Sequence, residues 1–297
     1  MFSRRTFLRT LGIGALSSVG LTSYGFAIEP RFRLVVTPYR IAPTAWPKGG
    51  RSLRIAAIAD IHACEPWMPL SRIEQIVATA NDLKPDIVVL LGDYMTGAFP
   101  SGVVPSAEWG RALGRLEAPL GIHAVLGNHD WWTDPDEVRG ALHDNDIPVM
   151  ENDAVLVRRD DGPAFWLIGL GDQLAHRVGH RRFRGVDDLP GTLLRIPDDD
   201  TPVVLLAHEP DIFVDVPSRV SLTLSGHTHG GQVAVPYVGR PVVPSAYGER
   251  LAYGHIVEDD RHLIVSGGLG CSMLPVRFGV PPEIVLIEVG GEAALEA

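Results

Sequence analysis

The sequence of 297 residues is poor in cysteine, and its two cysteines, Cys64 and Cys271, allow one disulfide at most. Neither a disulfide-rich scaffold nor a four-cysteine zinc module can be built from them. Any metal site must therefore use other ligands. Whether the two thiols pair with each other is left open, because a sequence does not fix the distance between them.

Basic residues are also in the minority, with 26 Lys and Arg against 36 Asp and Glu and a formal net charge of -10. Proteins that bind the phosphate backbone of nucleic acids carry a basic surface, so we expect no nucleic-acid scaffold role. Aromatic residues make up only 7% of the chain, whereas 45% is hydrophobic and there are 32 Gly and 24 Pro. This composition indicates a large, loop-rich globular domain and excludes a disordered or fibrous protein.

The N-terminus lacks a hydrophobic run long enough for an ordinary membrane span. The pair Arg4-Arg5 precedes an apolar stretch, Leu11 to Phe26, of about 16 residues, and a span needs roughly 20. This pattern resembles a twin-arginine export signal, with Ala27 as a small residue before cleavage. We predict a signal peptide over residues 1–27, passage through the twin-arginine translocase, and a location in the periplasm or cell envelope. An uncleaved anchor that keeps the protein membrane-associated is the alternative.

From Leu53 onward, short apolar runs rich in β-branched residues alternate with amphipathic stretches. Continuous apolar runs of this length are typical of strands buried on both faces. The strands are expected at Leu53 to Ala59, Asp86 to Leu91, Gly121 to Leu126, Phe165 to Leu170, Pro202 to Ala207, Ser221 to Leu224, His262 to Ser266 and Ile284 to Val289. Helical spacing predicts helices over Ser71 to Leu83, Pro105 to Leu116 and Pro135 to Asp144, the first with Ser71 as its cap. The alternation predicts an α/β fold in which two stacked sheets are flanked by helices.

The segments between these elements carry weaker signals. Residues 28–52 are expected to form an extended segment, with an outer strand or hairpin at Arg31 to Pro43, that leads into a domain over residues 53–297. Val155 to Leu170 is typical of a β-hairpin. Gly171 to Asp200 has no clear period, and we expect a long functional loop there. Its basic run, His176 to Arg184, is either a solvated loop or a lid that meets an anionic substrate or a phospholipid surface.

Side chains that suit metal ions follow five of the predicted strands. In open α/β sheets, reactive groups gather at the carboxyl ends of the strands. The candidates offer oxygen or imidazole ligands, which suit Mn, Fe or Zn: Asp60, His62, Asp93, Asn128, His208, His227 and His229. This set is too large for one tetrahedral ion, so we predict two divalent ions about 3.5 Å apart that share a carboxylate. Two such ions carry more positive charge than the ligand carboxylates neutralise, and a phosphate ester would neutralise the remainder.

The motifs D-x-H, G-D, G-N-H-D, H and G-H-x-H, in this order, resemble those of the calcineurin-like metallophosphoesterases from about Leu53 to Val289. The sequences G-H-T-H-G-G-Q and P-V-R-F-G-V-P-P-E are similar to those of a secreted or membrane-associated bacterial branch that often carries twin-arginine signals. The resemblance implies a four-layer α/β/β/α sandwich with two central mixed β-sheets and a metal site at the carboxyl ends of the strands. It also implies a metal-dependent phosphoester hydrolase that uses a hydroxide bridging two metals.

The resemblance further implies a role for each site residue. Asp60, His62 and His229 would hold the first metal and Asn128, His208 and His227 the second, with Asp93 bridging. His129 would protonate the leaving alkoxide, although a residue that only hydrogen-bonds the phosphate fits the same sequence. Asp130 would either orient His129 or cap the following turn. Arg277 is a candidate to bind a phosphate through its planar fork.

Four aromatic residues lie near these motifs, and they either line the mouth of the site or pack beneath its loops: Trp67, Tyr94, Trp131 and Trp132.

On the family resemblance alone, we expect the substrate to be a phosphodiester or a pyrophosphate linkage, such as an envelope or lipid-linked diester, in preference to a simple monoester. One alternative is a membrane-associated hydrolase similar to UDP-2,3-diacylglucosamine pyrophosphatase, but that substrate is cytoplasmic, so export counts against it. Another is a non-catalytic metal-binding scaffold, which the complete ligand set and His129 oppose. The identity of the metals, the substrate and the oligomeric state are open at this point.

Overall fold

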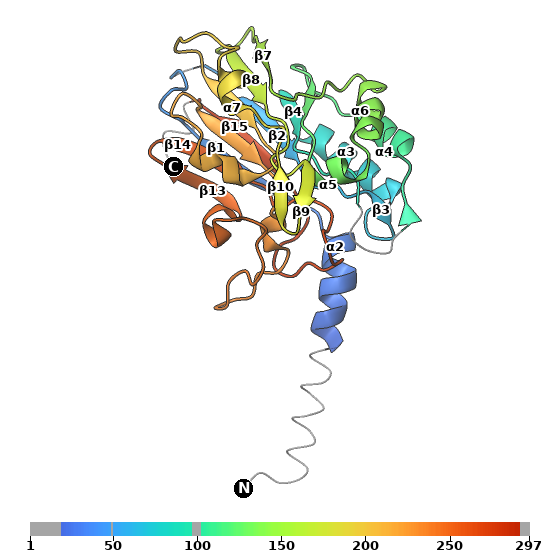
Figure 1. Ribbon diagram of the computed structural model, residues 1–297. Helices are drawn as coiled ribbons and strands as arrows, with labels where there is room; N and C mark the ends of the chain where they lie inside the picture. Colours follow the sequence, from blue (N-terminus) through green and yellow to red (C-terminus); the bar gives the residue numbers. More distant parts are fainter. Residues whose placement is uncertain (1–18, 49, 97–101, 292–297) are drawn as a thin grey trace, which may run out of the picture.

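The computed structural model describes residues 19–48, 50–96 and 102–291. Two β-sheets pack face to face in it, with helices outside them (Figure 1). The predicted twin-arginine pair, Arg4-Arg5, lies outside the described residues. Helical residues 19–32 project from the body of the molecule (Figure 1). Among the helices that the structure describes, none combines the length and the apolar character that crossing a bilayer requires.

The first sheet has five strands in the order β1-β15-β2-β4-β6. Their bounds are β1 (Val35–Ile41), β15 (Glu283–Val289), β2 (Leu53–Ile58), β4 (Ile87–Leu90) and β6 (Ile122–Ala124). Strands β2, β4 and β6 run parallel, whereas β15 pairs antiparallel with β2 and parallel with β1. Every residue of β4 is buried, as its unbroken apolar sequence predicts for a central strand covered on both faces.

The second sheet has six strands in the order β13-β14-β12-β11-β8-β7. Their bounds are β13 (Gly254–Glu258), β14 (Arg261–Val265), β12 (Leu222–Ser225), β11 (Val203–Leu206), β8 (Phe165–Gly169) and β7 (Asp153–Val157). The central strands are parallel, and the two edge strands, β13 and β7, are antiparallel to their neighbours. The predicted β-hairpin in the Val155 to Leu170 region is the β7–β8 pair.

Three apolar clusters define the layers of the fold. One cluster lies between the first sheet and helices α3 (Leu70–Asp82), α4 (Ser106–Leu113) and α6 (Pro135–His143). A second cluster fills the space between the two sheets. A third lies between the second sheet and the short helices α7 (Leu189–Leu193) and η2 (Pro210–Val214). The predicted α/β/β/α sandwich is therefore confirmed, with a thinner outer layer on the second sheet.

The remaining elements are short and lie near the carboxyl ends of the central strands or on the connections: η1 (Tyr24–Ile28), α2 (Glu29–Phe32), β3 (Cys64–Glu65), β5 (Gly102–Val103), α5 (Asn128–Thr133), β9 (His176–Gly179), β10 (Arg182–Arg184), η3 (His229–Gly231) and η4 (Gly248–Leu251).

Two local expectations were wrong. Helix α3 begins at Leu70 with Pro69 in the N-cap position and has no side-chain cap, so the predicted capping by Ser71 is absent. The segment Gly171 to Asp200 is not an irregular loop throughout, because it contains α7 and the antiparallel pair β9–β10. The hairpin residues are mostly exposed, so burial imposes no alternation of apolar and polar residues that a sequence would reveal.

The N-terminal helical residues are attached to the body beside the C-terminal segment. The Gly25 carbonyl accepts a hydrogen bond from the Arg277 backbone amide at 2.9 Å. The side chain of Glu29 is buried and accepts from the Gly279 amide at 3.2 Å. Within residues 28–52, α2 is helical and departs from the expected extended segment, whereas β1 is extended as expected. Strand β1 is the outer strand expected within Arg31 to Pro43.

Candidate metal centre

All seven predicted ligands follow the carboxyl ends of strands at one side of the stacked sheets. Two follow β2, one each follows β4, β6 and β11, and two follow β12: Asp60, His62, Asp93, Asn128, His208, His227 and His229. The strands that carry them are parallel within each sheet, so their carboxyl ends point the same way. Apart from His227, which is partly exposed, these side chains are buried.

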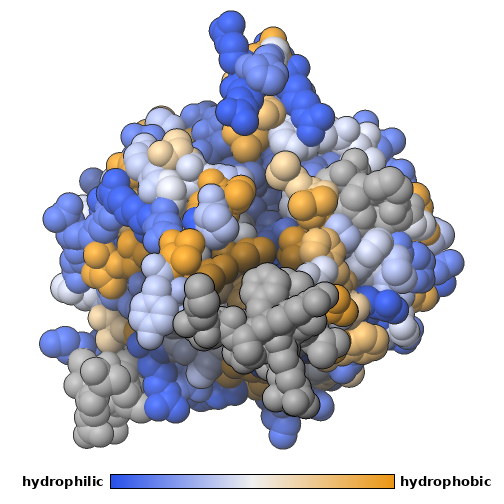
Figure 2. All heavy atoms as spheres, turned by 90° about the horizontal axis from the view of Figure 1, so that it is seen from below, coloured by the Kyte–Doolittle hydropathy of each residue, from blue (hydrophilic) through white to orange (hydrophobic). Residues whose placement is uncertain are grey.

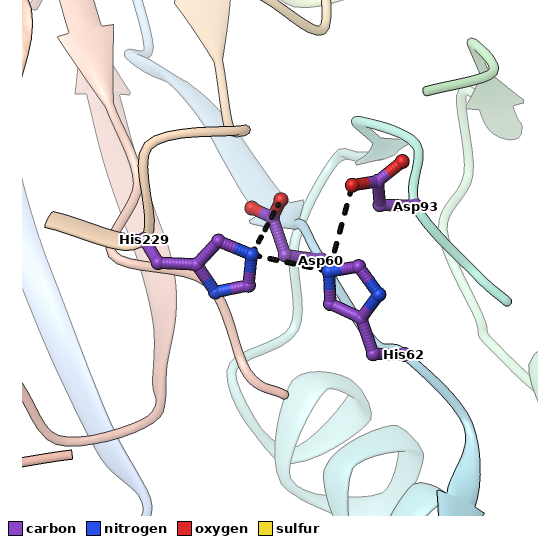
Figure 3. Close-up of side chains that lie close together, drawn as sticks. All are labelled: Asp60, His62, Asp93 and His229. Atoms are coloured by element: carbon purple, nitrogen blue, oxygen red, sulfur yellow. Dashed lines mark hydrogen bonds and ion pairs between the residues drawn. The ribbon is translucent and has the colours of Figure 1, made fainter. Parts of the chain in front are cut away.

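The first cluster joins Asp60, His62, Asp93 and His229, whose ligand atoms all lie within 4.8 Å of one another (Figure 3). The Nε2 atoms of His62 and His229 are 3.1 Å apart. The Nε2 atom of His229 is also 3.4 Å from Oδ1 of Asp60. Side chains from three separate strand ends therefore point at one small volume.

The second cluster joins His208, Glu209 and His227, again with ligand atoms within 4.8 Å of one another. Asn128 belongs to it as well, because its Oδ1 lies 2.8 Å from Nδ1 of His227. Glu209 was not predicted, although its place directly after His208 was an available signal. Its Oε2 atom accepts a hydrogen bond from the Gln173 backbone amide at 3.1 Å. Its carboxylate also neighbours that of Asp172, whose pKa is raised by burial and by Glu209.

Asp93 connects the two clusters. Its Oδ2 atom lies 3.5 Å from Nε2 of His62 in the first cluster and 3.3 Å from Nε2 of His208 in the second. Its other oxygen, Oδ1, accepts a hydrogen bond of 2.8 Å from the His129 backbone amide. One carboxylate oxygen thus faces imidazoles of both clusters, which is the geometry that a bridging ligand requires.

The imidazoles of His208 and His62 are oriented as metal ligands are. Nδ1 of His208 donates to the Leu91 carbonyl at 2.6 Å, and Nδ1 of His62 lies 2.9 Å from the Met95 carbonyl. Because a carbonyl only accepts, these contacts place a proton on Nδ1, and each neutral ring then turns the lone pair of Nε2 toward its cluster. The Nε2 atom of His208 is buried and lies 3.3 Å from Oδ2 of Asp93. This donor set fits two divalent cations.

Burial and neighbouring charges shift the titration of these groups. Burial lowers the pKa of His62 to about 3 and raises the pKa of Asp60 to about 7. Burial would also raise the pKa of Asp93, but the neighbouring His208 and His129 hold it well below its ordinary value. Burial would lower the pKa of His208, whereas the carboxylate of Asp93 raises it. Without a metal, a proton on His208 therefore balances the buried Asp93 carboxylate, and a cation would replace that proton.

The backbone at the site is strained. Five of the seven predicted ligands have positive φ angles: Asp60 (54°), His62 (46°), Asp93 (58°), His227 (67°) and His229 (52°). Residues other than glycine adopt this region rarely, at a cost of roughly 1–3 kcal/mol each, and such residues concentrate at functional sites. Nothing in the sequence indicated this strain, because each ligand carries a Cβ atom that disfavours it.

His129 lies at the edge of both clusters and is partly exposed. Its ring centroid is 4.8 Å from that of His62, and its Nε2 atom is 3.2 Å from Oγ of Ser272. Burial lowers the pKa of His129, and the Asp93 carboxylate opposes this shift. Ser272 was not predicted as a site residue, since no sequence motif separated it from other loop serines.

Asp130 is the third residue of α5 and caps the start of that helix, not the following turn that one of its two predicted roles required. Its side chain is fully buried and accepts from the Gly127 amide at 2.9 Å and from the Asp93 amide at 2.9 Å. It also accepts from the amides of Tyr94 and Met95. The hydrogen bonds of Asp130 therefore fix the loop that carries Asp93, and they go to backbone amides and not to the His129 ring.

Arg277 does not lie where a phosphate would contact it. Its side chain is fully buried and donates to the carbonyls of Gly270 and Val280. One of its terminal nitrogens lies 3.2 Å from Nδ1 of His229. Arg277 thus lies behind His229 and not at the expected phosphate contact. Burial, His62 and the positive charge of Arg277 all lower the pKa of His229.

The aromatic residues near the motifs divide between the two roles left open. Tyr94 is buried and stacks on Trp109 with a centroid distance of 5.4 Å, so it packs beneath the loops. Trp131 packs against the first apolar cluster. Trp132 lies beside the site, with its ring centroid 5.2 Å from that of His129. Trp67 donates to the Phe26 carbonyl in the N-terminal helix.

Comparison with known proteins agrees with this geometry. The family model described as calcineurin-like phosphoesterase matches residues 53–231, which include all seven predicted ligands. The metallophosphoesterase YkuE of Bacillus subtilis (strain 168) is 32% identical over 96% of both chains. A metallophosphoesterase of Aquifex aeolicus (strain VF5) is 30% identical over 87% of this chain and 93% of its own. The phosphodiesterase YaeI of Escherichia coli (strain K12) is 29% identical over 97% of this chain and 100% of its own.

Proposed function

The chain belongs to the calcineurin-like phosphoesterase family, and on that premise we propose that it is a dinuclear metal-dependent enzyme that hydrolyses a phosphodiester or pyrophosphate linkage. The observation that carries this proposal is the position of Asp93. Its Oδ2 atom faces His62 at 3.5 Å and His208 at 3.3 Å, so one carboxylate is shared by two ligand clusters.

The two clusters correspond to two ion sites. Asp60, His62 and His229 would hold one divalent ion and Asn128, His208 and His227 the other, with Asp93 shared. Ions of Mn, Fe or Zn suit these imidazole and oxygen ligands. When bound, such a pair supplies a hydroxide nucleophile at neutral pH and neutralises charge on the phosphate oxygens. Glu209 is a further carboxylate within reach of the second site.

The protein residues around the clusters would orient the ligands and handle the proton. The His129 amide holds one oxygen of Asp93 and so directs the other toward the two imidazoles. The His129 side chain is our proposed proton donor to the leaving oxygen, because it is partly exposed at the edge of both clusters. Burial opposes its protonation, whereas Asp93 and an arriving phosphate anion favour it.

A diester or pyrophosphate substrate is preferred over a monoester. The name of the E. coli relative, phosphodiesterase YaeI, supports this preference. The test is the metal content of protein folded in its native host, measured together with hydrolysis of bis(4-nitrophenyl) phosphate and of 4-nitrophenyl phosphate. About two ions per chain and faster cleavage of the diester are expected. A protein that cleaves neither ester after reloading with Mn, Fe and Zn would be a scaffold, and the proposal would be wrong.

We further propose that the protein reaches the cell envelope through the twin-arginine translocase, on the motif at Arg4-Arg5. The described helix runs through the predicted cleavage position after Ala27, and Gly25 and Glu29 are buried against the body. These contacts favour a retained N-terminal helix over a cleaved signal, and so an anchored form close to envelope or lipid-linked diesters. The mass of the exported protein distinguishes a chain that retains residues 1–27 from one that begins at Ile28.

A further inference from the structure

The β9–β10 hairpin concentrates positive charge beside the metal centre of an acidic protein. Its four arginines are exposed: Arg177, Arg181, Arg182 and Arg184. None of them forms an ion pair with any residue that the structure describes. Exposed arginines elsewhere do form such pairs, including Arg40 with Glu288, Arg115 with Glu74 and Arg250 with Glu258. The hairpin is therefore locally positive on a chain whose formal net charge is -10.

The hairpin is fixed to the site through Trp132. The Cζ atom of Arg177 lies 3.6 Å from the centroid of the Trp132 ring. Phe183, the cross-strand partner of Arg177, stacks on the same ring at a centroid distance of 5.5 Å. Trp132 in turn lies beside His129 and donates its Nε1 proton to the Leu174 carbonyl at 2.9 Å. Figure 1 shows the hairpin, in yellow, next to α5.

This arrangement holds a guanidinium in place without using its hydrogen bonds. A guanidinium that stacks on an indole keeps its N–H edges available, and those edges match a phosphate or a carboxylate. Arg177 also has no carboxylate partner among the described residues that would compete for them. In the proposed function, two metal ions neutralise the charge of the scissile phosphate. The positive charge of the hairpin is therefore available to bind a different anionic group.

We propose that the β9–β10 hairpin recognises a second anionic group of the substrate, a phosphate or carboxylate beyond the scissile linkage, with Arg177 as the direct contact. The inference rests on the proposed function for the scissile linkage itself. Seen from below, the molecule has a hollow near the middle of this face with both hydrophobic and hydrophilic side chains at its edges (Figure 2). A pyrophosphate-linked substrate or a diester with an anionic tail carries such a second anionic group.

The test uses three 4-nitrophenyl phosphodiesters whose second alcohols are ethanol, choline and 3-hydroxypropanoate, which give neutral, cationic and anionic tails. We expect kcat/KM of the full-length, metal-loaded protein to be highest for the anionic tail and lowest for the cationic one. In Arg177→Gln, the preference for the anionic over the neutral tail is expected to fall about tenfold, the scale of one charge-assisted hydrogen bond. Arg177→Lys retains the charge without the planar fork and is expected to fall between the two.

Two further variants separate recognition from misfolding. The double variant Arg181→Gln/Arg182→Gln leaves both Trp132 contacts in place and is expected to reduce the same preference. Arg158→Gln is the matched control, because Arg158 is exposed and lies in the β7–β8 turn, at the opposite end of β8 from the site. An unchanged preference in both hairpin variants would overturn the inference while leaving the proposed function intact.

The inference can also be decided if no ester is cleaved and the proposed function fails. Calorimetric titration with inorganic pyrophosphate then compares binding to the parent protein and to Arg177→Gln. About tenfold weaker binding by the variant supports anion recognition by the hairpin, and equal binding overturns it. A different outcome is that the variants lose binding to phosphatidylglycerol vesicles while their kcat/KM values for all three soluble diesters equal those of the parent. In that case the hairpin contacts a membrane surface and the inference is wrong.

Discussion

The carboxylate of Asp130 accepts the backbone amide of Asp93 at 2.9 Å. The same carboxylate also accepts the amides of Gly127, Tyr94 and Met95. One buried side chain at the start of α5 therefore fixes the loop that follows β4, and with it the carboxylate shared by the two clusters. A site assembled from separate strand ends needs such a connection, because the ligands must keep their spacing before any ion binds.

Asp130→Asn tests this connection. The amide retains one acceptor oxygen but replaces the other with a donor, so at least one of the backbone amides loses its partner. We expect a loss of roughly 1–3 kcal/mol in the free energy of unfolding and a 10- to 100-fold weaker affinity for metal. Asp198→Asn in an exposed turn is the control. Normal metal affinity in Asp130→Asn would show that the loop holds Asp93 without this carboxylate.

Asp93→Ala addresses the shared ligand directly. Removing a carboxylate that faces both His62 and His208 is expected to release both ions or to leave one loosely held. The measurement is metal content after dialysis, with His229→Ala as the comparison, because His229 belongs to the first cluster and its loss should spare the second ion. Two tightly bound ions in Asp93→Ala would contradict the bridging role.

Much of the fold was predictable from the sequence because its central strands are buried on both faces. Runs such as Ile87–Leu90 and Val203–Leu206 are apolar throughout, and burial alone requires that pattern. The β9–β10 hairpin could not be predicted, since its exposed residues satisfy no burial pattern. The start of α3 was misplaced because Ser71 matched a capping pattern, whereas the helix begins one residue earlier.

The ligand set of the candidate site followed from residue types at strand ends, but its mechanical support did not. Arg277 shows the reason: its planar fork suggested phosphate binding, yet it is buried behind His229. A cation can be buried only where carbonyl oxygens accept its hydrogen bonds, and here those of Gly270 and Val280 do so. Glu209 and Ser272 entered the site for the same reason, through contacts between segments far apart in the sequence.

Arg277→Met is expected to destabilise the protein by roughly 3 kcal/mol or more, because buried carbonyl oxygens lose their donor and each such loss costs about 1–3 kcal/mol. Metal affinity is expected to fall as well, since His229 loses the group behind it. The measurements are chemical unfolding of metal-free protein and metal titration. Arg219→Met, at a partly exposed arginine, is the control. A variant with parental stability but a higher KM would restore Arg277 as a substrate contact.

His129→Ala is expected to lower turnover by about 10²-fold or more, the scale of general-acid catalysis, while metal content stays nearly intact. The loss should be larger for a diester with a poor alkyl leaving group than for one that releases 4-nitrophenolate, because a stable leaving anion needs no proton. His143→Ala is the control, since His143 lies on the surface at the end of α6. Equal losses for the two leaving groups would leave His129 as a phosphate-binding residue and not a proton donor.

Metal binding is expected to release protons at pH 7. Burial raises the pKa of Asp60 to about 7, so this ligand retains a proton at far higher pH than an exposed aspartate does. Burial would lower the pKa of His208, but the Asp93 carboxylate raises it, so the ring also carries a proton that an ion must displace. Protons and metals compete for the same atoms, and the affinity must therefore fall as the pH is lowered from 8 to 6.

Calorimetric titration of metal-free protein in Pipes and in Tris separates the proton count from the heat of binding, because the two buffers differ in ionisation enthalpy. Between about one and two protons should leave per chain as both sites fill. In Asp60→Asn the side chain has no carboxyl proton to lose, so metal binding should release fewer protons per chain. A heat of binding that did not depend on the buffer would mean that the ligands are already deprotonated at pH 7. The buried carboxylates would then have to be balanced by another positive charge. Arg277, which lies behind His229, is the candidate for that charge.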